Sequence, residues 1–302
     1  MLELLMSGKK TNAPPSAQQL DNAVFATAAA STYGFHHAPV TVGNRIYHFG
    51  VYTGSGSALA RYYDAGSNSF VQIANVPTSI YGAAAEHYNG KIYIIGGTRG
   101  DGTRNAIIYD IETNTYSRGT TNLPDMSYFG VAIKDDTMYF AGVDNTSNLY
   151  KYNVITHVLT TVNIGTVAEN GSTNTIVAGW LYVHGGRTAA NAHLKTAYRV
   201  NLDTNAVEQL AELPQALMVA WTRFVWGQYI VLVGGMASSG NSSTTHGYIY
   251  YDTINNVYVV RPTPGSIRGF CWCGLVGSTF FMFAGIRGGT GLSDSIRLNI
   301  AV

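Results

Sequence analysis

Charged residues are scarce in this chain. Asp, Glu, Lys and Arg make up 12% of the 302 residues, and the net charge is +1, whereas charged residues are about 25% of an average globular protein. No basic run is longer than Lys9-Lys10. Because non-specific nucleic-acid binding needs many phosphate contacts, this composition argues against a nucleic-acid partner. The surface must instead be rich in Ser, Thr, Asn, Gly and Tyr.

Cysteine is almost absent as well. Cys271 and Cys273 flank Trp272 in a segment that reads as a strand, where alternate side chains point the same way but are poorly placed for a mutual disulfide. A Cys-x-Cys pair without a His or Cys partner at ligand spacing is a poor metal site. The sequence therefore predicts two buried free thiols, and it predicts neither a metal nor a cofactor.

Long apolar runs are also missing. No stretch approaches the ~20 apolar residues that a membrane-spanning helix needs, so we expect no membrane span. The opening Met1-Leu2-Glu3-Leu4-Leu5-Met6 is too short for the apolar region of a signal peptide and has no basic flank before it. We therefore expect synthesis in the cytoplasm without a secretion signal.

What the chain does contain is a repeat. Six runs of β-branched and aromatic residues each end in one or two glycines, at intervals of 44–50 residues. Such runs read as buried strands that meet a turn. No segment shows a sustained period of 3.6, so helical repeats are excluded. The last glycines of the six copies are Gly50, Gly97, Gly142, Gly186, Gly235 and Gly285.

A second element follows in five of the copies. An apolar or aromatic residue precedes Asp or Asn, a polar turn follows, and another apolar residue stands seven positions after the first, which reads as a hairpin. The pairs are Tyr63-Asp64 with Phe70, Tyr109-Asp110 with Tyr116, Tyr152-Asn153 with Leu159, Val200-Asn201 with Val207, and Tyr251-Asp252 with Tyr258.

This pattern resembles the Kelch repeat over residues 33–302. The family's Trp at the last position is replaced in all five hairpins, and three copies carry one glycine. The resemblance implies an all-β, six-bladed β-propeller with four strands per blade. The last copy ends at Val302 without an outer strand, so we expect the run at 22–29 to pair beside 294–301. An N-terminal strand would thus complete the last blade and close the ring. The predicted domains are an arm at 1–20 and a propeller at 21–302.

The arm carries an apolar patch followed by a flexible and then a stiff linker. We predict that it anchors the protein to a larger assembly, with a frayed terminus as the alternative. The residues of the predicted anchor are Leu2, Leu4, Leu5 and Met6.

Ligand binding is expected on one face of the propeller. In propellers, the loops after the glycine-ended strands share a face with the connections into each new inner strand, and variable loops on a rigid scaffold usually carry binding. Arginines there could bind carboxylates in bidentate fashion, or each could pair locally with an aspartate. Aromatic rings could stack on sugars or anchor peptides. The candidates are Tyr33, His36, Tyr52, Tyr81, Arg99, Arg104, Tyr128, Arg187, Trp221 and Arg287.

Catalytic signatures are weak. The Ser-x-Asp-x-Gly-x-Thr boxes of sialidase propellers and the nucleophile elbow of hydrolases are absent. Glu86, beside His87, is the one carboxylate that we expect in the central channel. The sequence therefore predicts a non-enzymatic protein without catalytic residues.

Together these features predict a structural or recognition protein, most simply a phage virion appendage such as a tail or fibre component for host attachment. Its arm would dock on a virion structural protein, and its loop face would act in receptor binding, on a host surface glycan or protein. Two alternatives stay open. One is an enzyme like the sugar epimerases and oxidases that share the Kelch fold, and the other is a cytoplasmic protein-interaction module.

Overall fold

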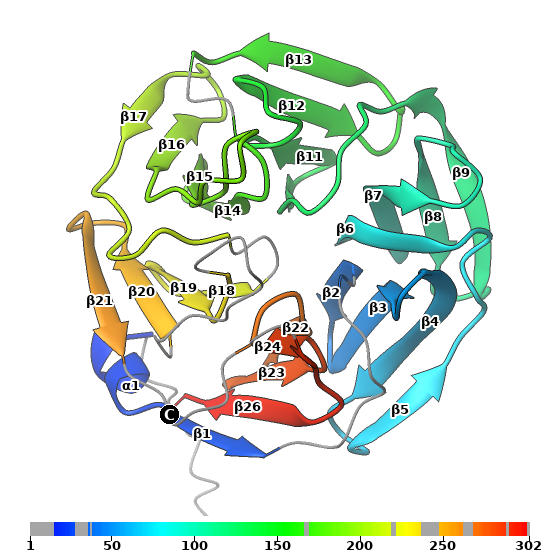
Figure 1. Ribbon diagram of the computed structural model, residues 1–302, viewed down its shortest axis with the longest axis horizontal. Helices are drawn as coiled ribbons and strands as arrows, with labels where there is room; N and C mark the ends of the chain where they lie inside the picture. The colour runs from blue at the N-terminus through cyan, green and yellow to red at the C-terminus, as the bar shows by residue number, and fades with distance from the viewer. Residues whose placement is uncertain are drawn as a thin grey trace, which may run out of the picture.

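Antiparallel sheets stand around a central axis in the computed structural model of the protein, which is an all-β propeller (Figure 1). One short helix, α1 (Ala17–Asp21), precedes the strands. The structure describes residues 15–27, 36, 38–165, 169–218, 222–236, 248–261, 268–287 and 290–300.

Within the described residues, four of the sheets have four strands each. The first three are built from consecutive strands: β10 (Ala132–Lys134), β11 (Thr137–Phe140), β12 (Asn148–Asn153) and β13 (Leu159–Asn163); β14 (Thr173–Val177), β15 (Trp180–His184), β16 (Ala197–Asn201) and β17 (Val207–Gln209); β18 (Arg223–Trp226), β19 (Tyr229–Val233), β20 (Tyr248–Asp252) and β21 (Val257–Arg261). Strands β14 and β18, the first strands of two of these sheets, lie nearest the axis (Figure 1).

An eight-stranded sheet holds the strands that follow the N-terminal segment, and a two-stranded ribbon lies near the C-terminus. The large sheet contains β2 (Ala38–Val42), β3 (Arg45–Tyr52), β4 (Gly56–Asp64), β5 (Ser69–Gln72), β6 (Ile80–Tyr88), β7 (Lys91–Arg99), β8 (Asn105–Asp110) and β9 (Thr115–Asn122). The ribbon is β24 (Ile286–Arg287) with β25 (Thr290–Gly291).

The remaining four-stranded sheet joins the two ends of the chain. Its strands run in the order β22 (Trp272–Val276), β23 (Thr279–Phe283), β26 (Ser295–Asn299) and β1 (Val24–Thr27) from the axis outward. The segment expected to pair beside 294–301 therefore supplies the outer strand, with Val24 opposite Asn299 and Thr27 opposite Ile296. Figure 1 shows β1 lying along β26 at the rim.

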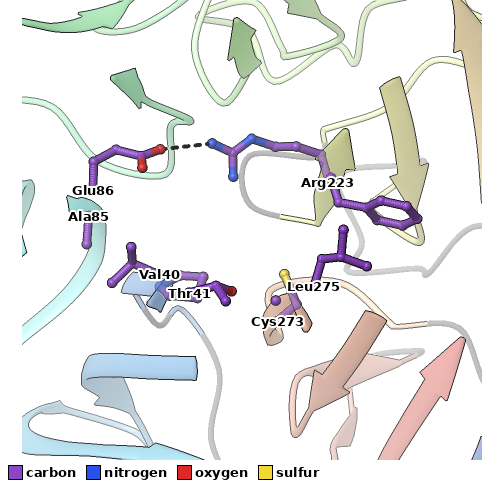
Figure 2. Close-up of a pocket in the computed structure, with 10 residues that line it drawn as sticks. Val40, Thr41, Ala85, Glu86, Arg223, Cys273 and Leu275 are labelled. Atoms are coloured by element: carbon purple, nitrogen blue, oxygen red, sulfur yellow. Dashed lines mark hydrogen bonds and ion pairs between the residues drawn. The ribbon is translucent and has the colours of Figure 1, made fainter. Parts of the chain in front are cut away.

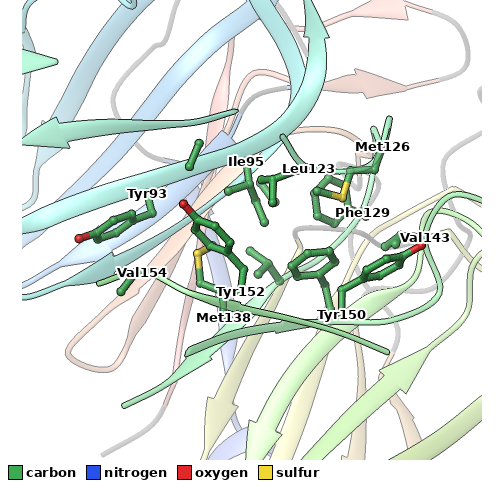
Figure 3. Packing of buried hydrophobic residues seen from close by; sticks show 14 of the residues in the cluster. Tyr93, Ile95, Leu123, Met126, Phe129, Met138, Val143, Tyr150, Tyr152 and Val154 are labelled. Atoms are coloured by element: carbon green, nitrogen blue, oxygen red, sulfur yellow. The ribbon is translucent and has the colours of Figure 1, made fainter. Parts of the chain in front are cut away.

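The apolar core lies between neighbouring sheets. Tyr93 and Ile95 on β7 face Met138 on β11 and Tyr152 on β12, and all of these side chains are buried (Figure 3). Similar clusters fill the other gaps. The β-branched and aromatic runs of the repeat are thus buried on both faces, because each sheet is covered by its neighbours on either side.

One position of the repeat has the same backbone conformation in every copy, and it differs from the last glycine in four of the six copies. This position is left-handed in every copy, and it is the first glycine where two adjacent glycines occur. At this position, Gly142 and Gly185 have φ values of 64° and 66°, and Ala284 takes the same conformation with φ 54°. The other members are Gly50, Gly96 and Gly234, with φ 68°, 64° and 71°.

This position is also where one repeat touches the next. A Cβ atom on Gly185 would lie 2.2 Å from the carbonyl oxygen of Leu217. A Cβ atom on Gly50 would lie 2.1 Å from the carbonyl oxygen of Ile80, and one on Gly96 would lie 2.7 Å from that of Met126. At Gly50, Gly96 and Gly185 the approach of the neighbouring backbone therefore requires a glycine, whereas the last copy has Ala284 at this position.

The Tyr-Asp element is explained by its hydrogen bonds. Asp110 Oδ1 accepts from the backbone N–H of Thr113, which holds the turn, and Asn114 adopts a left-handed conformation at its end. Tyr109 donates its hydroxyl to Asn114 Oδ1 at 2.9 Å, and the same oxygen accepts from the N–H of Ala74. The predicted hairpins are therefore confirmed, and their turn asparagine also ties one pair of strands to another.

Helix α1 packs on the sheet of β18–β21. Ser16 caps the helix through the N–H of Gln19, and Leu20 is fully buried in the apolar cluster that also contains Phe280. Asp21 forms an ion pair with Arg261. Residues 15–20, which the sequence assigned to the arm, thus contact the propeller, while the anchor residues Leu2, Leu4, Leu5 and Met6 lie outside the described residues.

Two further expectations concern composition. Cys271 and Cys273 are buried free thiols, as predicted. Within the described part of the chain, no helix has the length and apolar character needed to cross a membrane.

Candidate functional site

Five aromatic side chains gather at the end of the central channel where the inner strands begin. His36 lies at the centre of this aromatic cluster. Its ring centroid is 4.3 Å from that of Phe270 and 4.7 Å from that of Tyr128, both edge-on. Tyr52 and Tyr81 lie 5.8 Å and 6.2 Å from His36 and 4.9 Å from each other. All five side chains are half-buried, so each ring packs against its neighbours and keeps part of its surface accessible.

The backbone beneath the aromatic cluster is unusual. The N–H of His36 donates to the carbonyl of Phe270, that of Gly82 to His36, and that of Tyr128 to Gly82, so hydrogen bonds connect successive inner segments around the axis. All four residues have positive φ, between 52° and 69°. This conformation costs a residue with a side chain roughly 1–2 kcal/mol, and such strain concentrates at functional sites. The strained backbone fixes three of the rings at the channel mouth.

The cluster rests on apolar side chains. Tyr128 and Phe270 pack against the buried residues Met218, Met236 and Ile286. Burial raises the pKa of the Tyr128 hydroxyl to about 12, against a smaller opposite effect of the Arg187 charge. Tyr128 is therefore a neutral hydrogen-bonding group at physiological pH, with a guanidinium nearby.

The four predicted arginines differ in their surroundings. Arg99 is buried and donates from Nε to the carbonyl of Gly96 and from Nη1 to that of Asn105, so it holds its own loop instead of facing a ligand. Arg187 is half-buried beside Tyr128, whereas Arg104 and Arg287 are exposed. Of the aromatic candidates, Tyr33 and Trp221 lie outside the described residues.

A second group of polar side chains faces the channel further along its axis. Glu86 on β6 points across the channel toward Arg223 on β18 (Figure 2), with 3.5 Å between Glu86 Oε1 and Arg223 Nη2. Arg223 also donates from Nε to the carbonyl of Asn174 and from Nη2 to that of Val131. One guanidinium therefore connects strands from three sheets across the channel.

Two cavities border this ion pair. One of about 220 Å³ is lined by Val40, Leu275 and Cys273 among others, and a second of about 240 Å³ lies between β10, β14 and β18. Burial raises the pKa of Glu86 to about 7, although the charge of Arg223 lowers it. Glu86 is thus confirmed as a channel carboxylate, and it is close to half-protonated at neutral pH.

Comparisons with known proteins agree with this architecture. The family model described as the Kelch motif matches residues 79–123, which cover β6 to β9. That segment carries a Kelch motif within the propeller fold. A solved structure titled "Structure of YjhT" superposes with a TM-score of 0.76 at 12% identity, covering 89% of this chain and 96% of that one. At this identity the similarity establishes the fold alone. No curated protein matches the chain.

Sequence reasoning missed one member of these sites, Phe270, and did not single out another, Arg223. Phe270 lies directly before β22 at the place that His36 holds before β2, and both have positive φ. Alignment of the residues that precede each inner strand could have found it. Arg223 was one of several arginines without a distinguishing signal, because its contacts with Glu86 and Val131 join residues 137 and 92 positions apart.

Proposed function

We propose that this Kelch propeller is a recognition protein whose aromatic cluster binds a carbohydrate on the loop face. The observation that carries the proposal is the set of half-buried rings held by strained backbone at the channel mouth. Sugar rings have apolar C–H faces that pack on aromatic rings, while hydroxyl groups such as that of Tyr128 supply hydrogen bonds. Arg187 beside Tyr128 favours a glycan with an acidic group.

Binding should depend on the rings of the cluster. We expect Tyr81→Ala, and separately Tyr52→Ala, to weaken binding to the recognised glycan by about tenfold or more, because central aromatic contacts are typically worth more than about 1 kcal/mol. The measurement is a glycan array followed by titration with the glycan that binds. Tyr88→Ala, at the opposite end of β6, is the matched control and should bind normally. Equal binding by all three variants would contradict the proposal.

We also propose that the ring has six blades. In the eight-stranded sheet, β4 and β6 meet at one residue pair, Ser57 with Ile80. On either side of it, β2–β5 and β6–β9 repeat the inner-to-outer strand order of the four-stranded sheets. The large sheet would thus serve as two blades, and β1 on β26 would close the circle.

In its biological setting, we propose that the protein is a virion appendage that attaches to the particle through its N-terminal residues. The support is the charge-poor composition and the apolar patch of Leu2, Leu4, Leu5 and Met6. A protein lacking residues 1–14 should fail to capture a virion structural protein that the full chain captures from an infected-cell lysate. Truncation at 14 is preferable to truncation at 20, because Leu20 is buried in the propeller. Equal capture by both proteins would contradict the anchoring role.

An enzyme of the sugar epimerase or oxidase kind is the second candidate. The observation that favours it is Glu86, a channel carboxylate with a pKa of about 7, which suits proton transfer at neutral pH. Incubation with galactose or sialic acids, followed by NMR, separates the two functions. Turnover that Glu86→Gln abolishes would replace the recognition function with this one.

A further inference from the structure

The second channel cavity combines an aliphatic wall with unsatisfied polar groups. Ile133 and Ile176 line it, together with Glu86, Arg223 and Thr175. Thr175 is 5% exposed, and its hydroxyl is buried without a hydrogen-bond partner among the described residues. A buried hydroxyl in this state is destabilising, and a bound molecule that accepts its hydrogen bond removes that cost. The cavity is thus complementary to a molecule that has a polar group on one side and a hydrocarbon group on the other.

The Arg223 guanidinium can donate further hydrogen bonds into this cavity. Its Nε and Nη2 atoms donate to Asn174, Val131 and Glu86, whereas no hydrogen bond from Nη1 is found among the described residues. The contact with Glu86 is long, at 3.5 Å, and both side chains keep about a fifth of their surface exposed. A guanidinium with a free edge and a weakly held counter-ion is a receptor for another carboxylate.

We propose that this cavity binds a small aliphatic carboxylate, with the carboxylate group between Arg223 and Thr175 and the hydrocarbon tail against Ile133 and Ile176. The site is separate from the aromatic cluster and does not depend on the carbohydrate-binding function. Its aliphatic lining disfavours a polyhydroxylated acid, whose hydroxyl groups would be buried without partners.

Binding should be coupled to a proton. The incoming carboxylate places a second negative charge beside Glu86, so Glu86 takes up a proton from solvent, and the protonated carboxyl can donate to the ligand. The other ionisable groups that line the two cavities, within the described residues, are Arg223 and the Cys273 thiol, whose pKa is raised by burial. Since the pKa of free Glu86 is about 7, affinity should be highest below this pH and fall as the pH rises above it.

The test is calorimetric titration of the full chain with 3-methylbutanoate. We expect saturable binding with net proton uptake, and an affinity about tenfold or more higher near pH 6 than near pH 8.5. The neutral isostere 3-methylbutanamide should not bind measurably. Absence of saturable binding by the carboxylate, or equal binding of the amide, would overturn the proposal.

Three variants locate the site. Thr175→Val is nearly isosteric and should lower affinity about threefold to tenfold through the lost hydrogen bond. Ile176→Trp fills the cavity without removing a charged group and should abolish binding. Glu86→Gln should still bind, but without the pH dependence. Each variant is first checked for an unchanged circular dichroism spectrum. Wild-type affinity in Ile176→Trp, or an unchanged pH dependence in Glu86→Gln, would refute the assignment.

Discussion

Gly50→Ala should destabilise the protein far more than Gly43→Ala, although both glycines have positive φ values, of 68° and 57°. A Cβ atom on Gly43 would have no atom within 4 Å, whereas one on Gly50 would lie 2.1 Å from the carbonyl oxygen of Ile80. The control variant therefore carries only the left-handed backbone cost of about 1–2 kcal/mol. The Gly50 variant must also move β6 away from β3, and overpacking of this kind adds about 1–3 kcal/mol.

The measurement is thermal unfolding of the two variants beside the wild type. At roughly 2–4 °C per kcal/mol for a domain of this size class, the Gly50 variant should melt about 4–20 °C below the wild type and clearly below the Gly43 variant. Equal melting temperatures for the two variants would show that backbone conformation alone selects the repeat glycine. The contact of Gly50 with the next repeat would then not be the cause.

The sequence was most informative at positions where the local backbone conformation restricts the type of residue. Asn114 and Gly96 stand in left-handed conformations, and the polar turn residues and glycines at such positions are what made the strands and hairpins predictable. The same rule explains why the last glycine of a copy does not mark the shared position. Gly97 follows Gly96 and also has positive φ, so residue type alone could not tell which of the two touches the next sheet.

The candidate site was less predictable because its residues are far apart in the sequence and come together only in the folded propeller. His36 contacts Phe270 and Tyr128, which hold equivalent places in distant repeats but differ in residue type, so no shared residue marks them in the sequence. Arg99 and Arg187 both follow glycine-ended strands, yet Arg99 turns back onto the carbonyls of its own loop. The direction in which each arginine points depends on the packing of its loop, and neither composition nor spacing predicts that packing.

Removal of residues 1–27 should have the second large effect, because it strips the outer strand from β26. The deletion removes the four residue pairs of β1 with β26 and the buried Leu20. It also removes the ion pair between Asp21 and Arg261. Loss of a buried leucine side chain alone costs about 2–5 kcal/mol. In addition, β26 becomes an open edge that can pair with another chain.

A protein lacking only residues 1–14 is the matched control, because it keeps α1 and β1. We expect the control to unfold at the wild-type temperature and to elute as the full chain does. The protein lacking residues 1–27 should unfold at a much lower temperature and form aggregates on size-exclusion chromatography. Leu20→Ala in the full chain should fall between them, since it keeps β1 on β26. If the protein lacking residues 1–27 matched the control in both measurements, the contacts of α1 and β1 would be dispensable, and closure of the ring would have to rest on contacts between the inner strands.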